Sequence, residues 1–118
     1  MLDQARGKVL VVEDVALIRM TTVDMLEQIG FAACEAADGP QALTLLRQDD
    51  GIDILLTDLG LPGMTGLQLV EEALRLKPSL KVIIASGYST PEKEAPNGPV
   101  LYLTKPYDLP RLRRVLES

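Results

Sequence analysis

Four short apolar runs in this sequence each end within two residues of a side chain that could take part in chemistry. In chain order, those side chains belong to Glu13, Asp14, Asp58, Ser86 and Lys105. Three carboxylates held close together repel one another, and a hard cation such as Mg²⁺ is their natural partner. An ammonium and a hydroxyl beside them could hold the oxygens of a phosphoryl group. The set therefore points to phosphoryl transfer, where positioning and charge neutralisation supply most of the catalysis.

The chain contains no histidine. This excludes histidine-based catalysis and a histidine phosphoacceptor within these residues. A carboxylate nucleophile is already ionised at neutral pH and needs no general base, which suits such a site.

Five apolar runs predict the strands that would position these side chains, and helical patterns lie between or after them. The predicted strands are Val9–Val12, Phe31–Cys34, Ile52–Leu56, Val82–Ala85 and Val100–Leu103. The predicted helices cover residues 15–29, 38–48, 65–76 and 108–116. Alternating strands and helices predict an α/β fold with a parallel sheet covered on both faces. Ligands bind beyond the carboxyl ends of the strands in such sheets.

Local signals mark where these helices begin and end. We expect Asp38, Thr65 and Asp108 to cap helix N-termini, and Gly30 to stop the first helix. In that first helix, Ile18, Met25 and Ile29 fall on one face, which we expect to be apolar.

Residues 86–99 contain three prolines and an Asn-Gly pair, so we expect a loop there with at most a short helical turn. We also expect residues 87–99 to be the most mobile part of the domain and to respond to phosphorylation.

Length and charge limit the class of protein. The 118 residues fit one domain, 1–118, and 47% of them are apolar, enough for a core. A net charge of −5 argues against nucleic acid or an anionic membrane as the main partner. One cysteine, Cys34, and the lack of a signal peptide or membrane-spanning run predict a cytoplasmic protein.

Four motifs, in order and each at a strand end, resemble the receiver domain of two-component response regulators. They are VVED at 11–14, LLTDLGLPGMTG at 55–66, IIASGY at 83–88 and LTKPYD at 103–108. The resemblance extends from Lys8 to Leu116. It implies a flavodoxin-like, doubly wound, five-stranded parallel sheet with strand order 2-1-3-4-5.

The resemblance also implies a role for each site residue. Asp58 would accept a phosphoryl group, and Ser86 and Lys105 would contact that group. Mg²⁺ would be held by the acidic pair Glu13 and Asp14, with Asp14 the more direct ligand, together with Asp58 and the backbone carbonyl of Gly60. Tyr102 matches an aromatic residue whose rotamer reports activation, and the family often has a cis peptide before the residue corresponding to Pro106.

The implied phosphodonor is a sensor histidine kinase or a histidine phosphotransfer protein. We expect it to contact Val15, Ala16, Arg19, Pro106 and Tyr107, which flank the predicted site. The resemblance implies a phosphoryl acceptor with slow self-dephosphorylation and not a turnover enzyme.

Two features depart from the family pattern. The proline-rich stretch shortens or replaces the usual fourth helix, as in receivers similar to the C-terminal domains of hybrid kinases. This puts in doubt the family dimer formed by the fourth helix, fifth strand and fifth helix. Gly60 lacks a side chain and Tyr88 is bulky, at positions that influence how fast water removes the phosphoryl group.

Other functions fit parts of the pattern. A phosphorylation-independent pseudo-receiver would act as an interaction module, although such domains usually lose residues that this chain keeps. A haloacid-dehalogenase-type hydrolase would need Asp at position 60, where Gly stands, and a flavin- or nucleotide-binding protein would need a glycine-rich loop after the first strand. Single residues also have structural roles open to them: Asp58, Glu13 and Asp14 as caps, Ser86 as a turn hydroxyl, Lys105 as a surface charge and Tyr102 as packing.

Overall fold

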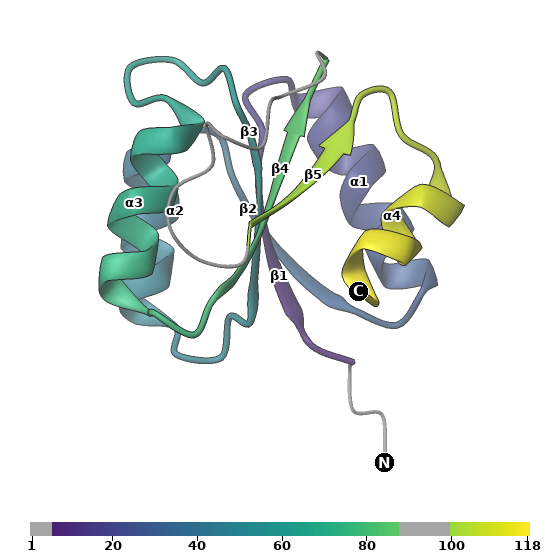
Figure 1. Cartoon of the computed structure of the whole chain (residues 1–118), viewed down its shortest axis with the longest axis horizontal. Helices are drawn as coiled ribbons and strands as arrows, with labels where there is room; N and C mark the ends of the chain where they lie inside the picture. Colours follow the sequence, from purple (N-terminus) through teal and green to yellow (C-terminus); the bar gives the residue numbers. More distant parts are fainter. Residues whose placement is uncertain (1–5, 88–99) are drawn as a thin grey trace.

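The computed structural model describes residues 6–87 and 100–118, which form a parallel sheet between two layers of helices (Figure 1). The strands are β1 (Lys8–Val12), β2 (Ala32–Ala36), β3 (Ile54–Asp58), β4 (Lys81–Ser86) and β5 (Val100–Thr104). The helices are α1 (Ala16–Gln28), α2 (Gly39–Gln48), α3 (Gly66–Leu76) and α4 (Leu109–Leu116). The strand order is β2-β1-β3-β4-β5, all parallel, which confirms the predicted flavodoxin-like α/β fold.

Side chains alternate between the two faces of the central strands, because successive residues of a strand point in opposite directions. Leu10, Leu55 and Ile84 pack in a buried cluster with α2 and α3. Val9 and Ile83 pack in a second buried cluster with α1 and α4. Figure 1 shows the same division, with α2 and α3 on one side of the sheet and α1 and α4 on the other.

The predicted caps are confirmed. The Asp38 carboxylate accepts from the backbone N–H of Gln41 (2.9 Å), and the Asp108 carboxylate accepts from that of Arg111 (3.0 Å). Thr65 forms a capping box with Gln68, satisfying two amide groups that the first turn of α3 leaves open. Gly30 has a φ of +92°, the left-handed region that favours glycine after a helix.

The predicted strand bounds are wrong in detail, most of all for the second and third strands. The second strand covers Ala32–Ala36 and not Phe31–Cys34, and the third covers Ile54–Asp58 and not Ile52–Leu56. Backbone pairing sets these limits: Ala36 pairs with Val12, and Asp58 pairs with Ala85. Hydropathy misplaces both, because a polar residue at a strand end pairs through its backbone as well as an apolar one.

The predicted face of α1 is confirmed at Met25 and Ile29 but not at Ile18. Ile29 is 5% exposed and Met25 packs against the same core cluster as the buried Leu26, whereas Ile18 is 38% exposed. The start of α1, residues 16–18, is exposed, and the spacing of apolar residues does not show how much of a helix the sheet covers.

Residues 88–99 lie outside the described residues. They include Tyr88 and nearly all of the predicted loop, so the loop's expected response to phosphorylation stays a prediction. The same holds for the expected loss or shortening of the helix that the family has between its fourth and fifth strands, and for its consequence for dimers. Within the described ranges, no helix has the length and apolar character needed to cross a bilayer.

Candidate functional site at the carboxyl edge of the sheet

Four strands deliver the predicted site residues to one edge of the sheet. Asp58 and Ser86 are the last residues of β3 and β4, while Glu13 and Lys105 directly follow β1 and β5. Carboxyl ends of parallel strands meet at the same edge, so residues up to 92 positions apart become neighbours. The predicted convergence of these side chains is therefore present in the fold.

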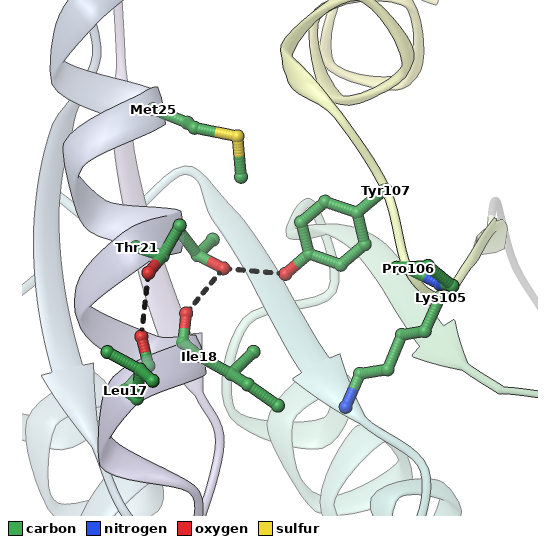
Figure 2. A pocket seen from close by; sticks show the side chains of 8 residues that line it. Leu17, Ile18, Thr21, Met25, Lys105, Pro106 and Tyr107 are labelled. Atoms are coloured by element: carbon green, nitrogen blue, oxygen red, sulfur yellow. Dashed lines mark hydrogen bonds between the residues drawn. The ribbon is translucent and has the colours of Figure 1, made fainter.

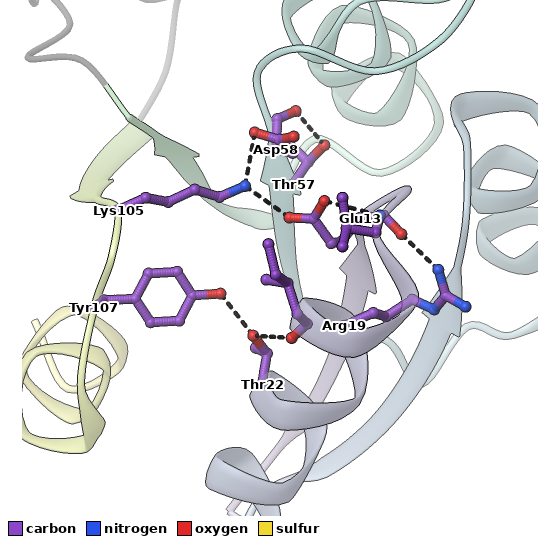
Figure 3. A network of polar contacts seen from close by, with 9 residues as sticks. Glu13, Arg19, Thr22, Thr57, Asp58, Lys105 and Tyr107 are labelled. Atoms are coloured by element: carbon purple, nitrogen blue, oxygen red, sulfur yellow. Dashed lines mark hydrogen bonds and ion pairs between the residues drawn. The ribbon is translucent and has the colours of Figure 1, made fainter.

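The Lys105 side chain reaches from the end of β5, an outer strand, and contacts two carboxylates (Figure 3). Its Nζ is 2.7 Å from Glu13 Oε1 and 3.2 Å from Asp58 Oδ1. Partial burial lowers the pKa of the Lys105 ammonium, but the nearby Glu13 and Asp58 carboxylates raise it by more, so the net pKa lies above its ordinary value. Lys105 is thus a fixed positive charge beside Asp58.

Glu13, Asp14 and Asp58 form an acidic cluster, each offering an oxygen within 4.8 Å of the others. Glu13 is 4% exposed, and its second oxygen accepts from the backbone N–H of Val15 (3.1 Å). Asp14 is exposed. Hard oxygen donors gathered in this way fit Mg²⁺, which takes one or two carboxylates and keeps several waters.

Arg19 fixes the turn that carries the acidic pair. Its Nη1 donates to the backbone carbonyl of Glu13 (2.7 Å), and its Nε donates to the Glu35 carboxylate (3.1 Å) at the end of β2. The sequence analysis placed Arg19 only on the surface that contacts the phosphodonor. It missed the bond to the Glu13 carbonyl, because a spacing of six residues gives no sign of such a contact.

The remaining predicted residues lie within two positions of the carboxyl ends of β3, β4 and β5. Ser86 is 4% exposed, and its backbone carbonyl accepts from the N–H of Lys105 (2.8 Å). Gly60 is exposed in the loop after Asp58. Tyr102, in β5, packs against the core cluster beneath α2 and α3.

Gly66 supports Asp58 in a way that sequence reasoning missed. Its N–H donates to the Leu59 carbonyl (2.8 Å), so the first turn of α3 lies directly on the end of β3. A Cβ at Gly66 would lie 2.3 Å from the Asp58 carbonyl oxygen. Only glycine permits this close approach. The sequence Gly-Met-Thr-Gly at 63–66 does not show which of its two glycines must lack a side chain.

A groove of about 450 Å³ opens beside the site, between α1 and the segment after β5 (Figure 2). Its lining is almost entirely apolar and includes Ile18, Met25, Pro106 and Tyr107, with Lys105 at one end. The Lys105–Pro106 peptide is cis, as the resemblance implies.

Comparison with known proteins agrees with the fold and the motifs. Residues 9–117 match the model of the response regulator receiver domain, so the chain belongs to that family. It is 36% identical over 115 residues to the sensor kinase CckA of Brucella abortus, covering 93% of this chain but 12% of that protein. It is 32% identical to the chemotaxis protein CheY of Pseudomonas aeruginosa, covering 94% of each chain.

Among solved structures, the chemotaxis protein CheY4 of Vibrio cholerae superimposes with a TM-score of 0.87 at 27% identity. The match covers 96% of this chain and 98% of that one. The chain is a receiver domain of two-component signalling.

Proposed function

We propose that this chain accepts a phosphoryl group on Asp58 in a Mg²⁺-dependent reaction and so acts as a relay element or switch. The observation that carries the proposal is the contact of Lys105 with Asp58 inside the acidic cluster of Glu13, Asp14 and Asp58. A carboxylate held beside a fixed ammonium and further oxygen ligands matches what phosphoryl transfer to an acid requires.

In the proposed reaction, an Asp58 carboxylate oxygen forms a bond to phosphorus as the bond from phosphorus to the donor nitrogen breaks. The donor imidazole leaves with the electron pair of that bond. Lys105 would move from its carboxylate partners toward a phosphoryl oxygen, and the Ser86 hydroxyl would donate to another. The product is an acyl phosphate on Asp58, and the chain is an acceptor with slow self-dephosphorylation.

The metal would be held by Asp14, Asp58 and the carbonyl of Gly60. Bound there, Mg²⁺ would neutralise charge on the phosphoryl oxygens. Glu13 is already engaged by Lys105 and by the N–H of Val15, which supports Asp14 as the more direct ligand.

The phosphodonor would be a phosphohistidine of a sensor histidine kinase or of a histidine phosphotransfer protein. Val15 is 46% exposed at the start of α1, and Pro106 is exposed across the groove. Apolar side chains presented to solvent beside a reactive group suit a protein donor. The name of the related sensor kinase agrees with such a partner.

Replacement of Val15 by serine tests this docking surface. We expect V15S to slow transfer from a donor protein several-fold while leaving transfer from acetyl phosphate unchanged. Arg19 is a poor choice for this experiment, because its bond to the Glu13 carbonyl links it to the acidic pair. Equal slowing with both donors would show that Val15 matters to chemistry or folding and not to docking.

Intact-mass measurement tests the proposal as a whole. The wild-type chain should gain one phosphoryl mass from acetyl phosphate in Mg²⁺ and none in EDTA, and Asp58→Asn should gain none. The alternative is a phosphorylation-independent interaction module, and it predicts no mass gain in any sample. Equal gain in wild type and Asp58→Asn would place the acceptor elsewhere.

A further inference from the structure

Two polar contacts link the segment after β5 to α1 and to the turn that precedes it. The Lys105 ammonium contacts Glu13 at 2.7 Å, and the Tyr107 hydroxyl lies 2.7 Å from the Thr22 hydroxyl (Figure 3). Tyr107 and Lys105 are separated by a single residue, Pro106. The second contact therefore restrains the same short segment that presents the ammonium to Asp58.

The chemistry of Thr22 gives this second contact a direction. A threonine hydroxyl has one proton, and that of Thr22 goes to the backbone carbonyl of Ile18 (2.9 Å). Thr22 is 1% exposed, so its hydroxyl oxygen is shielded from bulk solvent. The Tyr107 hydroxyl is therefore the donor, and Figure 2 shows it pointing across the groove to α1. A tyrosine hydroxyl is protonated at neutral pH, and burial raises the pKa of Tyr107 further.

Tyr107 fills a gap between two other anchors of the segment. On one side, the N–H of Lys105 donates to the Ser86 carbonyl (2.8 Å). On the other, Asp108 caps α4. Pro106 has no N–H to donate, so the Tyr107 side chain supplies the link to the body of the protein between these points.

We propose that the hydrogen bond from Tyr107 to Thr22 positions Lys105 against Asp58 and holds the segment in place while the ammonium exchanges its partners. Tyr107 and Thr22 are positioning residues, because neither touches the acidic cluster's ion pairs. The predicted effect of this hydrogen bond on the phosphorylation rate rests on the proposed function, with Asp58 as the phosphoacceptor. Its predicted effect on the mobility of Lys105 does not depend on phosphoryl transfer.

The test uses Tyr107→Phe, Thr22→Val and the double variant in the full chain. Tyr107→Phe keeps the ring in the groove and leaves Thr22 its own bond to Ile18. Thr22→Ser retains the acceptor oxygen and serves as the rescue variant. Thr44→Val is the matched control, because Thr44 makes the same kind of bond to the carbonyl four residues earlier, in the exposed face of α2.

The first measurement is the mobility of Lys105 in the metal-free protein, from carbon relaxation at its Cε. We expect greater mobility in Tyr107→Phe and Thr22→Val, and wild-type values in Thr22→Ser and Thr44→Val. The second is the rate of phosphorylation by acetyl phosphate at saturating Mg²⁺. We expect a fall of roughly threefold to tenfold in both single variants, the range that one net hydrogen bond represents, with an unchanged Mg²⁺ dissociation constant.

The double variant identifies the bond itself. Because each single change removes the same contact, the double variant should be no slower than the slower single variant. The proposal is wrong if Tyr107→Phe leaves both Lys105 mobility and rate unchanged, or if the two effects multiply. A wild-type chain that takes no phosphoryl group would refute the proposed function, while the mobility measurement would still decide the role of Tyr107.

Discussion

Replacement of Gly66 by alanine should destabilise the protein through a collision with the end of β3. The added Cβ would lie 2.3 Å from the Asp58 carbonyl oxygen and 2.8 Å from Leu59 Cα. Both are backbone atoms, so no side-chain rotation relieves the overlap, and the end of β3 or the start of α3 must move. That movement also strains the 2.8 Å bond from the Gly66 N–H to the Leu59 carbonyl.

The size of the effect follows from three contributions. Overpacking of this kind costs about 1–3 kcal/mol, and the weakened hydrogen bond costs up to about 1 kcal/mol. Alanine in a helix returns up to about 1 kcal/mol relative to glycine. The collision prevails, and we expect a net loss of about 1–3 kcal/mol in the free energy of unfolding. For a domain of this size, that loss lowers the melting temperature by about 4–12 °C.

Gly60, in the loop between β3 and α3, offers a matched control. A Cβ at Gly60 would have no other heavy atom within 4 Å, and its φ is not positive. Gly60→Ala should therefore be neutral or more stable by up to about 1 kcal/mol, because it restricts the unfolded chain. Urea denaturation of the wild type and both variants measures the difference. If Gly66→Ala proves as stable as Gly60→Ala, the close approach of α3 to Asp58 is refuted.

Two further predictions concern the charges of the site. Millimolar Mg²⁺ should raise the melting temperature of the wild type, because it relieves repulsion among the carboxylates, and should have no effect on Asp14→Ala, which is itself more stable than wild type without metal. A wild-type melting curve that ignores Mg²⁺ would contradict a site here. Lys105→Met should lower the free energy of unfolding at neutral pH, because Glu13 is left buried without its partner. Since the folded pKa of Lys105 is raised, this contribution is fully present below the unfolded pKa of about 10.4 and is lost as pH rises through the folded value. Denaturation of both proteins at a series of alkaline pH values should show the difference in their free energies of unfolding shrinking only above the unfolded pKa of Lys105. A difference that already shrinks near neutral pH would show that the ion pair is not its source.

The convergence of Asp58 and Lys105 was predictable from the sequence because it follows from topology. Once alternating strands and helices are recognised, parallel strands must bring their carboxyl ends to one edge. The helix caps at Asp38, Thr65 and Asp108 were predictable because capping depends on residues within three positions. Both kinds of inference use rules that do not require the packing of particular side chains.

The contacts that sequence reasoning missed depend on such packing. The bond between Tyr107 and Thr22 joins residues 85 positions apart, and a threonine in an apolar helix gives no sign of its partner. The need for glycine at position 66 arises from the angle at which α3 meets β3. The exposure of Ile18 on the predicted face of α1 was missed for a related reason: the packing of the helix on the sheet decides which of its turns are covered.

Localisation of the phosphoryl group tests the central claim most directly. After incubation with acetyl phosphate and Mg²⁺, borohydride reduction would convert an aspartyl phosphate to homoserine, and peptide mass spectrometry would identify the altered position. We predict homoserine at residue 58 in the wild-type chain and only in samples that contained Mg²⁺. Homoserine at another aspartate, or an unaltered Asp58 in protein that has gained the phosphoryl mass, would contradict the account.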